Sequence, residues 1–231
     1  MALHDPPPEL DACDFMDLFE KAVTVPDDGT ALQALSLALD RAENTLSRAF
    51  ITDLIERLRA QHRNVAERDA LTGCFNRVYL SRAWPLSVEV ALAGKSILTL
   101  ALVDLNGFKK INDQYGHRVG DTILEEWARD FSKNVPTSIS VGRWGGDEFY
   151  VFFTADRMDQ VQQKLTLVHK AACVQTSRGL SMRATIGAIT RDYTDADIAD
   201  LNACFDQADA VLRTAKRAGV EFSLNNASAL T

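Results

Sequence analysis

The sequence lacks any long apolar segment. No stretch of its 231 residues approaches the ~18–20 uninterrupted apolar residues that a membrane-spanning helix needs. The first residues, Met1-Ala-Leu-His-Asp-Pro-Pro-Pro, have neither the basic start nor the apolar segment of a secretory signal peptide. We therefore expect a cytoplasmic protein that inserts into no membrane.

The sequence also has few cysteines. Cys13, Cys74, Cys173 and Cys204 lie far apart and form no Cys-x-x-Cys pair. This spacing argues against a cysteine metal cluster and against a disulfide framework. We expect these cysteines to be small buried apolar residues.

An excess of basic residues is absent as well, since the net charge is −7. Residues 1–68 hold 13 acidic and 7 basic side chains, whereas residues 69–231 hold 19 acidic and 18 basic ones. A nucleic-acid polymer would require a basic face, so we expect no such partner. A mononucleotide remains compatible with this balance, because a local pocket with a divalent cation can hold a triphosphate.

Residues 1–68 have a pattern of their own. From residue 30 to residue 68 there is neither proline nor glycine, and apolar positions recur in alternating steps of three and four. This seam spacing is typical of a coiled coil, and the helix would extend on the order of 55 Å. The residues concerned are Leu32, Leu35, Leu39, Ala42 and Leu46, then Ile51, Ile55, Leu58, His62 and Val65.

We predict that residues 1–68 form an N-terminal α-helical stalk that makes the protein a homodimer. A single long helix packed on its own domain is the alternative. Because these residues contain no recognisable sensor domain, we also expect them to be a docking segment for a regulatory protein.

Residues 69–231 alternate between helical and strand patterns. We expect an α/β sandwich of the ferredoxin-like, palm type, in which helices flank a mostly antiparallel central sheet. The predicted helices are 76–93, which Pro85 should break or kink, 120–132, 159–177 and 198–218. The predicted strands are 96–105, 138–144, 149–155, 183–190 and 221–224.

Acidic residues stand at the ends of two predicted strands. Asp104 follows an apolar strand, and Asp147 and Glu148 lie in a hairpin beside two glycines. Carboxylates from neighbouring strands are suitable ligands for Mg²⁺, which would neutralise a triphosphate and lower the pKa of an attacking hydroxyl. The turn 106–109 offers backbone amides to phosphate oxygens, and Lys109 adds a positive charge.

Each of these features alone is ambiguous, because a Gly-Gly-Asp-Glu hairpin is often only a turn with solvated acids. Their order and spacing together are specific. The chain from Asp69 to Leu224 resembles the GGDEF family of diguanylate cyclases, which condense two GTP molecules into cyclic di-GMP. The matching blocks are Asp69-Ala-Leu71-Thr72-Gly73 with Asn76-Arg77, Asp104-Leu-Asn-Gly-Phe108-Lys109, Ile111-Asn112-Asp113-Gln-Tyr115-Gly116-His117 with Gly120-Asp121, Gly145-Gly146-Asp147-Glu148-Phe149, and Ala184-Thr-Ile186-Gly187 followed by Ala208-Asp209-Ala210, Ala215-Lys216 and Gly219.

The resemblance implies a role for each matching residue. Mg²⁺ (or Mn²⁺) would be held by Asp104, the carbonyl of Leu105, Asp147 and Glu148. Asp147, Glu148 and Lys109 would be catalytic, and either acid could be the base. Guanine would be read by Asn112 and Asp121, whose pairing adenine cannot satisfy. Leu71 and Phe108 would flank the base or support the turn, and the phosphates would be contacted by Gly107, Lys109 and Lys216.

The chain departs from the family pattern at four places. Val220 stands where an arginine is usual, and Arg213 or Arg217 is a candidate substitute. Asn106 replaces a frequent aspartate, and Cys74-Phe75 replaces Leu-Pro. The segment from Pro136 to Ile139 stands where the product-inhibition site would have Arg-x-x-Asp, so we expect no feedback inhibition there.

Each half-site of the implied enzyme would bind one GTP, so catalysis would require a symmetric dimer. Three alternatives remain. The first is a catalytically weak module that binds GTP or cyclic di-GMP, or that regulates another protein. The others are a cyclase or polymerase palm for another nucleotide, and a helical adaptor without catalysis.

Overall fold

The computed structural model describes residues 66–226. The chain divides into two compact units, and the second begins at Glu67. The stalk predicted for residues 1–68, and the dimer predicted to form through it, therefore lie almost wholly outside the described residues. Between residues 66 and 226, no helix is long and apolar enough to cross a membrane.

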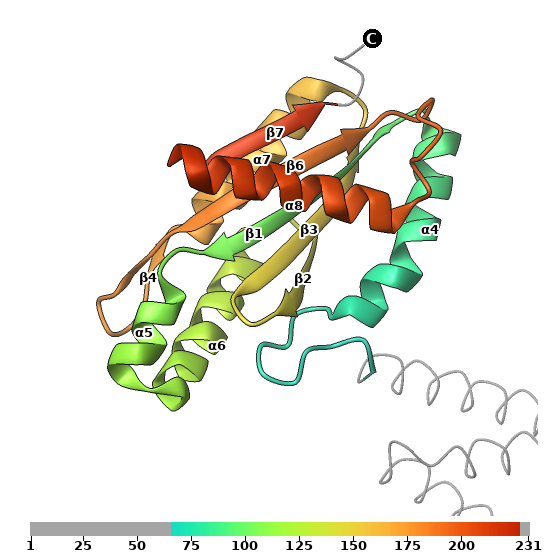
Figure 1. Cartoon of the computed structure of the whole chain (residues 1–231). Helices are drawn as coiled ribbons and strands as arrows, with labels where there is room; N and C mark the ends of the chain where they lie inside the picture. Colours follow the sequence, from blue (N-terminus) through green and yellow to red (C-terminus); the bar gives the residue numbers. More distant parts are fainter. Residues whose placement is uncertain (1–65, 227–231) are drawn as a thin grey trace, which may run out of the picture. The chain divides into compact units, whose positions relative to one another are not determined.

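The second unit is a five-stranded sheet with helices on both faces (Figure 1). The strand order is β2-β3-β1-β6-β7, and every neighbouring pair is antiparallel except β6–β7. This confirms the predicted mostly antiparallel sheet. The elements are α4 (Arg77–Gly94), β1 (Ile97–Leu105), α5 (Phe108–Tyr115), α6 (His117–Asn134), β2 (Ser140–Gly145), β3 (Glu148–Ala155), α7 (Met158–Ala172), β4 (Val174–Gln175), β5 (Ser181–Met182), β6 (Ala184–Arg191), α8 (Leu201–Ala218) and β7 (Phe222–Asn226).

The central strand β1 is buried on both faces, which explains its continuous apolar run. Its side chains alternate between two cores. Leu100 and Leu102 pack in the core beneath α4 and α8, whereas Ala101 and Val103 pack in the core with α6 and α7. The same alternation assigns Asp104, at the end of the strand, to the face that α8 covers.

Helix α8 lies close to the sheet because β6 has a glycine beneath it. A Cβ atom at Gly187 would overlap the backbone of Leu212 in α8. Only glycine permits this approach. The close packing holds the last turn of α8, which carries Lys216, above the end of β1.

Three expectations about the elements were wrong. The segment before α6 contains a separate helix, α5, where only a turn was expected. The predicted helix 159–177 ends at Ala172, and the chain continues into the small β4–β5 sheet. Pro85 does not break α4, because Trp84, Val88 and Ala91 are buried along one side of the continuous helix. Cys74 and Cys204 are buried as expected, Cys173 is half-buried, and all three are free.

Candidate active site

The β-ladders bring the acidic residues of two strands together. Asp104 in β1 is the register partner of Glu148 in β3 and of Thr185 in β6. Residues directly opposite each other in antiparallel strands project to the same face. Asp104 is only 8% exposed, whereas Glu148 is exposed. Glu148 also lines a cavity of about 210 Å³ beside α8.

Asp147 belongs to the turn between β2 and β3. Its carbonyl oxygen accepts a hydrogen bond of 3.3 Å from the amide of Leu105. This bond ties the turn to the end of β1, and the charge of Asp147 acts on Asp104. The predicted ligands Asp104, Leu105, Asp147 and Glu148 therefore converge at one end of the sheet.

Arg143 holds the β2–β3 turn through hydrogen bonds. Its Nε and Nη2 atoms donate to the carbonyl oxygen of Gly146, at 3.0 and 2.8 Å, and its Nη1 atom lies 2.9 Å from Oδ1 of Asp69. Burial raises the pKa of Asp69, but hydrogen bonds from Thr72 and Arg143 outweigh this effect and hold the pKa below its usual value. No role was predicted for Arg143, although its place just before the Gly145-Gly146 turn could have indicated one.

Lys216, in α8, contacts the carboxylate of Asp104. Its Nζ atom lies 2.6 Å from Oδ2 of Asp104. Burial raises the pKa of Asp104, Lys216 lowers it, and the charge of Asp147 raises it again, with a net rise. An ammonium group thus neutralises the carboxylate that was predicted to hold a cation.

The turn after β1 begins α5. Asn106 is anchored twice, since its amide donates to the carbonyl of Arg183 at 2.8 Å and its Oδ1 accepts from the hydroxyl of Thr185 at 2.9 Å. Lys109 is exposed in the first turn of α5. Phe108 is only 6% exposed and packs in the core with α6. Its position fits support of the turn better than contact with a base.

The two predicted guanine-reading residues lie on different helices. Asn112 is half-buried on α5, and Asp121 is exposed on α6. A Cβ atom at Gly120 would overlap Oδ1 of Asn112. The side chain of Asn112 therefore packs directly on the residue that precedes Asp121 in α6.

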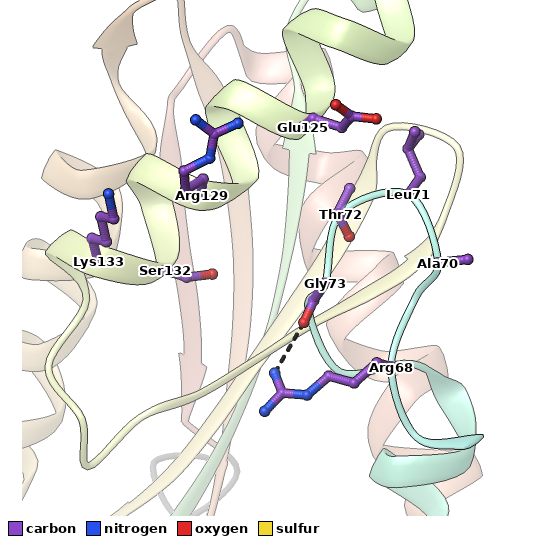
Figure 2. Close-up of a pocket in the computed structure, with 9 residues that line it drawn as sticks. All are labelled: Arg68, Ala70, Leu71, Thr72, Gly73, Glu125, Arg129, Ser132 and Lys133. Carbon is purple, nitrogen blue, oxygen red and sulfur yellow. Dashed lines mark hydrogen bonds between the residues drawn. The ribbon is translucent and has the colours of Figure 1, made fainter. Parts of the chain in front are cut away.

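Leu71 lies in the loop before α4, beside a separate cleft of about 580 Å³ (Figure 2). The loop residues 68–73 form one side of this cleft, and α6 forms the other with Glu125, Arg129 and Lys133. Figure 2 shows Leu71 projecting from the loop, and Arg68 donating to the carbonyl of Gly73 at 3.0 Å. The residues that line this cleft do not include Asp104 or Asp147.

The donor set at the end of β1 suits Mg²⁺. No group of three or more His, Cys, Asp or Glu side chains within residues 66–226 is placed to hold a metal ion. Mg²⁺ typically needs less from a protein: one or two carboxylates, with the remaining positions filled by water and substrate phosphates. The carboxylates of Asp104 and Asp147 and the carbonyl of Leu105 are hard oxygen donors of this kind.

A comparison with known families decides the classification. The protein-family model described as "Diguanylate cyclase, GGDEF domain" matches residues 66–221 of this chain. The chain belongs to the GGDEF family. The identification made from sequence motifs is thereby confirmed.

Relatives of this GGDEF protein include diguanylate cyclase DgcP of Pseudomonas aeruginosa, which is 32% identical over 81% of this chain and 27% of DgcP. The response regulator PleD of Caulobacter vibrioides is 30% identical over 64% of this chain and 35% of PleD. The chain thus spans about a third or less of these relatives.

Solved structures agree on the fold. The crystal structure of diguanylate cyclase SiaD with its activator SiaC, from Pseudomonas aeruginosa, has a TM-score of 0.63 at 27% identity, covering 94% of this chain and 86% of that one. A structure of the coiled coil and GGDEF domain of DgcB from Caulobacter crescentus has a TM-score of 0.62 at 24% identity, covering 78% and 96%. The latter likeness concerns the fold alone.

Proposed function

We propose that this GGDEF protein is an active diguanylate cyclase that joins two GTP molecules into cyclic di-GMP and releases pyrophosphate. The observation that carries this proposal is the convergence of Asp104, Asp147 and Glu148 at one sheet end. The ladder register and the hydrogen bond from Leu105 to Asp147 produce it. Lys216 adds a cation at the same place.

The roles follow from position and chemistry. Asp104, Asp147 and the Leu105 carbonyl would hold Mg²⁺ or Mn²⁺, with Glu148 as a further ligand or as the proton acceptor. The cation would supply charge neutralisation and a lowered pKa for the attacking 3′-hydroxyl. Asp147 or Glu148 accepts the proton of that hydroxyl. The amide of Gly107, Lys109 and Lys216 bind phosphate oxygens.

Guanine selection falls to the α5–α6 contact. An amide at Asn112 and a carboxylate at Asp121 together match the donors and acceptors of the guanine edge. Adenine would leave these groups unpaired, and such unpaired polar groups are what allow a site to reject the wrong base. Leu71 would border the base from the loop before α4. The nucleotide selected would therefore be GTP. A nucleic-acid polymer is not expected as a partner, because residues 69–231 carry no excess of basic side chains.

The product needs two such half-sites facing each other, so the active form is a homodimer. Residues 1–68 would hold the two domains together and raise their effective concentration. The likeness to SiaD extends over 94% of this chain, and that structure contains an activator protein. This supports the proposal that a regulatory protein docks on residues 1–68.

Feedback inhibition through the usual site is not part of this proposal. Pro136 and Ile139 occupy the two positions where a charged pair would bind the product, and Ile139 is buried. Neither side chain can pair with a phosphate or a guanine. Added cyclic di-GMP should leave the rate of the purified protein unchanged, and noncompetitive inhibition would contradict this.

One observation favours the alternative of a binding module. Val220 lines the cleft beside Lys216 and contributes no charge there. A direct test separates the two functions: incubate the purified full chain with GTP and Mg²⁺, and search for pppGpG and cyclic di-GMP by mass spectrometry. We expect both, and none from the double variant Asp147→Ala/Glu148→Ala. Binding of GTP without either product would instead support the module.

A further inference from the structure

A cleft of about 620 Å³ opens beside Asp104, between the turn after β1 and the end of α8. Its walls carry two cations, Lys216 and Arg183, and two acids, Asp104 and Glu221. Each cation is paired with an acid: Lys216 with Asp104, and Arg183 with Glu221. The cleft is thus electrically balanced without a ligand.

Arg183 has a fixed backbone and a reachable head group. It directly precedes β6, and its carbonyl oxygen accepts the amide of Asn106 at 2.8 Å. This bond places the backbone of Arg183 beside the turn that contains Gly107, which is proposed to bind phosphate. Its side chain is 61% exposed. A guanidinium has five N–H donors, so one ion pair with Glu221 leaves others for a ligand.

We propose that Arg183 is a phosphate-binding residue of this site, which grips the β- and γ-phosphates of the bound nucleotide. This inference rests on the proposed function, because it assumes a nucleoside triphosphate in the cleft. With a triphosphate and its cation in the cleft, Asp104 would hold the cation and Lys216 would bind the phosphates instead of Asp104. Arg183 supplies the second positive charge, in the planar fork that pairs well with phosphate oxygens.

The rest of the cleft explains why this charge is needed. Val220, on the same wall, is 45% exposed and apolar. Arg213 forms an ion pair with Asp209, and neither Arg213 nor Arg217 lines the cleft. Arg183 and Lys216 are the only cationic side chains that line it among the described residues. Arg183, rather than an arginine of α8, therefore takes this role.

Binding measurements on the full chain test the inference. With Mg²⁺ present, calorimetric titration compares a GTP analogue that has a methylene between its α- and β-phosphates with GMP, which lacks the outer phosphates. Arg183→Gln should weaken the analogue about tenfold or more, the loss of a charge-assisted contact. It should change GMP affinity less than about twofold. Val220→Arg in the Arg183→Gln background should restore much of the analogue affinity.

Glu221→Gln is the matched control, because it breaks the same ion pair and leaves the arginine in place. We expect it to keep or strengthen analogue binding. If both variants weaken the analogue and GMP alike, or if Arg183→Gln leaves analogue affinity unchanged, Arg183 is only a structural link between β6 and β7 and the inference fails. Product formation by the wild type tests the proposed function separately, so either result can fail without the other.

Discussion

The two halves of the candidate site are built in different ways. The acidic end of the sheet is set by backbone pairing, since β1 is bonded to β3 and β6 along its whole length. The proposed guanine side depends on two helices, α5 and α6, which meet where the side chains of Asn112 and Phe108 pack at Gly120. In the proposed function, the chemistry would take place at the end held by backbone pairing, whereas guanine recognition would depend on a contact between two helices that a small packing change can alter.

Removing the carboxylate of Asp104, at the acidic end of the sheet, should cause the largest loss of activity. Asp104→Asn keeps the size of the buried side chain but removes its charge, so the cation would lose a ligand that water replaces poorly. We expect cyclase turnover to fall by about 10² to 10³-fold while the ladder remains intact. Initial rates measured by pyrophosphate release would show this.

The control for Asp104→Asn is the stability of the fold. The tryptophans of the chain, Trp84, Trp127 and Trp144, all lie in the described unit, so their fluorescence in urea reports its unfolding. A midpoint close to that of the wild type, with the rate lost, supports a role in catalysis. Turnover within about threefold of the wild type would show that Asp104 holds no catalytic cation.

A single added methyl group at Gly120 should be enough to weaken guanine recognition. In Gly120→Ala the new Cβ atom overlaps the end of the Asn112 side chain, which can rotate away, so the fold is expected to survive. Alanine should even favour the helix by about 1 kcal/mol. The displaced amide should raise the KM for GTP about tenfold, the value of one buried polar contact, and reduce the preference for GMP over AMP in binding.

A substitution elsewhere on the same helix provides the comparison. Arg118→Ala changes an exposed residue in the first turn of α6 and should leave both the KM and the preference unchanged. If Gly120→Ala behaves in the same way, the contact between Asn112 and Gly120 does not set base selection. The helix-built half of the site would then be as tolerant as the rest of the surface.

The sequence predicted the acidic end of the site better than its surroundings, and the reason is physical. An apolar strand that ends in Asp104 and a Gly-Gly hairpin are local signals, and β-pairing converts them directly into proximity. Arg183 and Thr185 have no such signal, since they reach the cleft only through the order of strands in the sheet. Helix α5 was missed because it is short and polar, and it is held by Phe108 packing on α6.

The break that was one of the two outcomes predicted at Pro85 is absent from α4 for a related reason, and a kink there stays a prediction. A proline costs about 3 kcal/mol inside an isolated helix, which suggested a break at Pro85. In the folded unit, buried side chains before and after it, Trp84 and Val88 among them, hold the helix against the sheet. Tertiary packing of this kind cannot be read from propensity alone.

The smallest expected effect concerns the support beneath the hairpin turn, where Asp69 pairs with Arg143. Because its folded-state pKa is below the usual value, ionised Asp69 stabilises the fold above its unfolded pKa of about 4. This contribution is lost as the pH falls through the lower, folded-state pKa. Asp69→Asn should therefore destabilise the unit by about 1 kcal/mol at pH 7, and the difference should shrink as the pH falls below about 4.

Asp159 provides the control, because its pKa is also lowered by a paired arginine, Arg157. This pair, however, is exposed, and water screens such pairs so strongly that they add little to stability. Urea midpoints from tryptophan fluorescence should thus shift for Asp69→Asn and not for Asp159→Asn. Equal shifts would mean that the link between Arg143 and the turn contributes no more than a surface contact, and that backbone pairing alone holds the acidic end of the site.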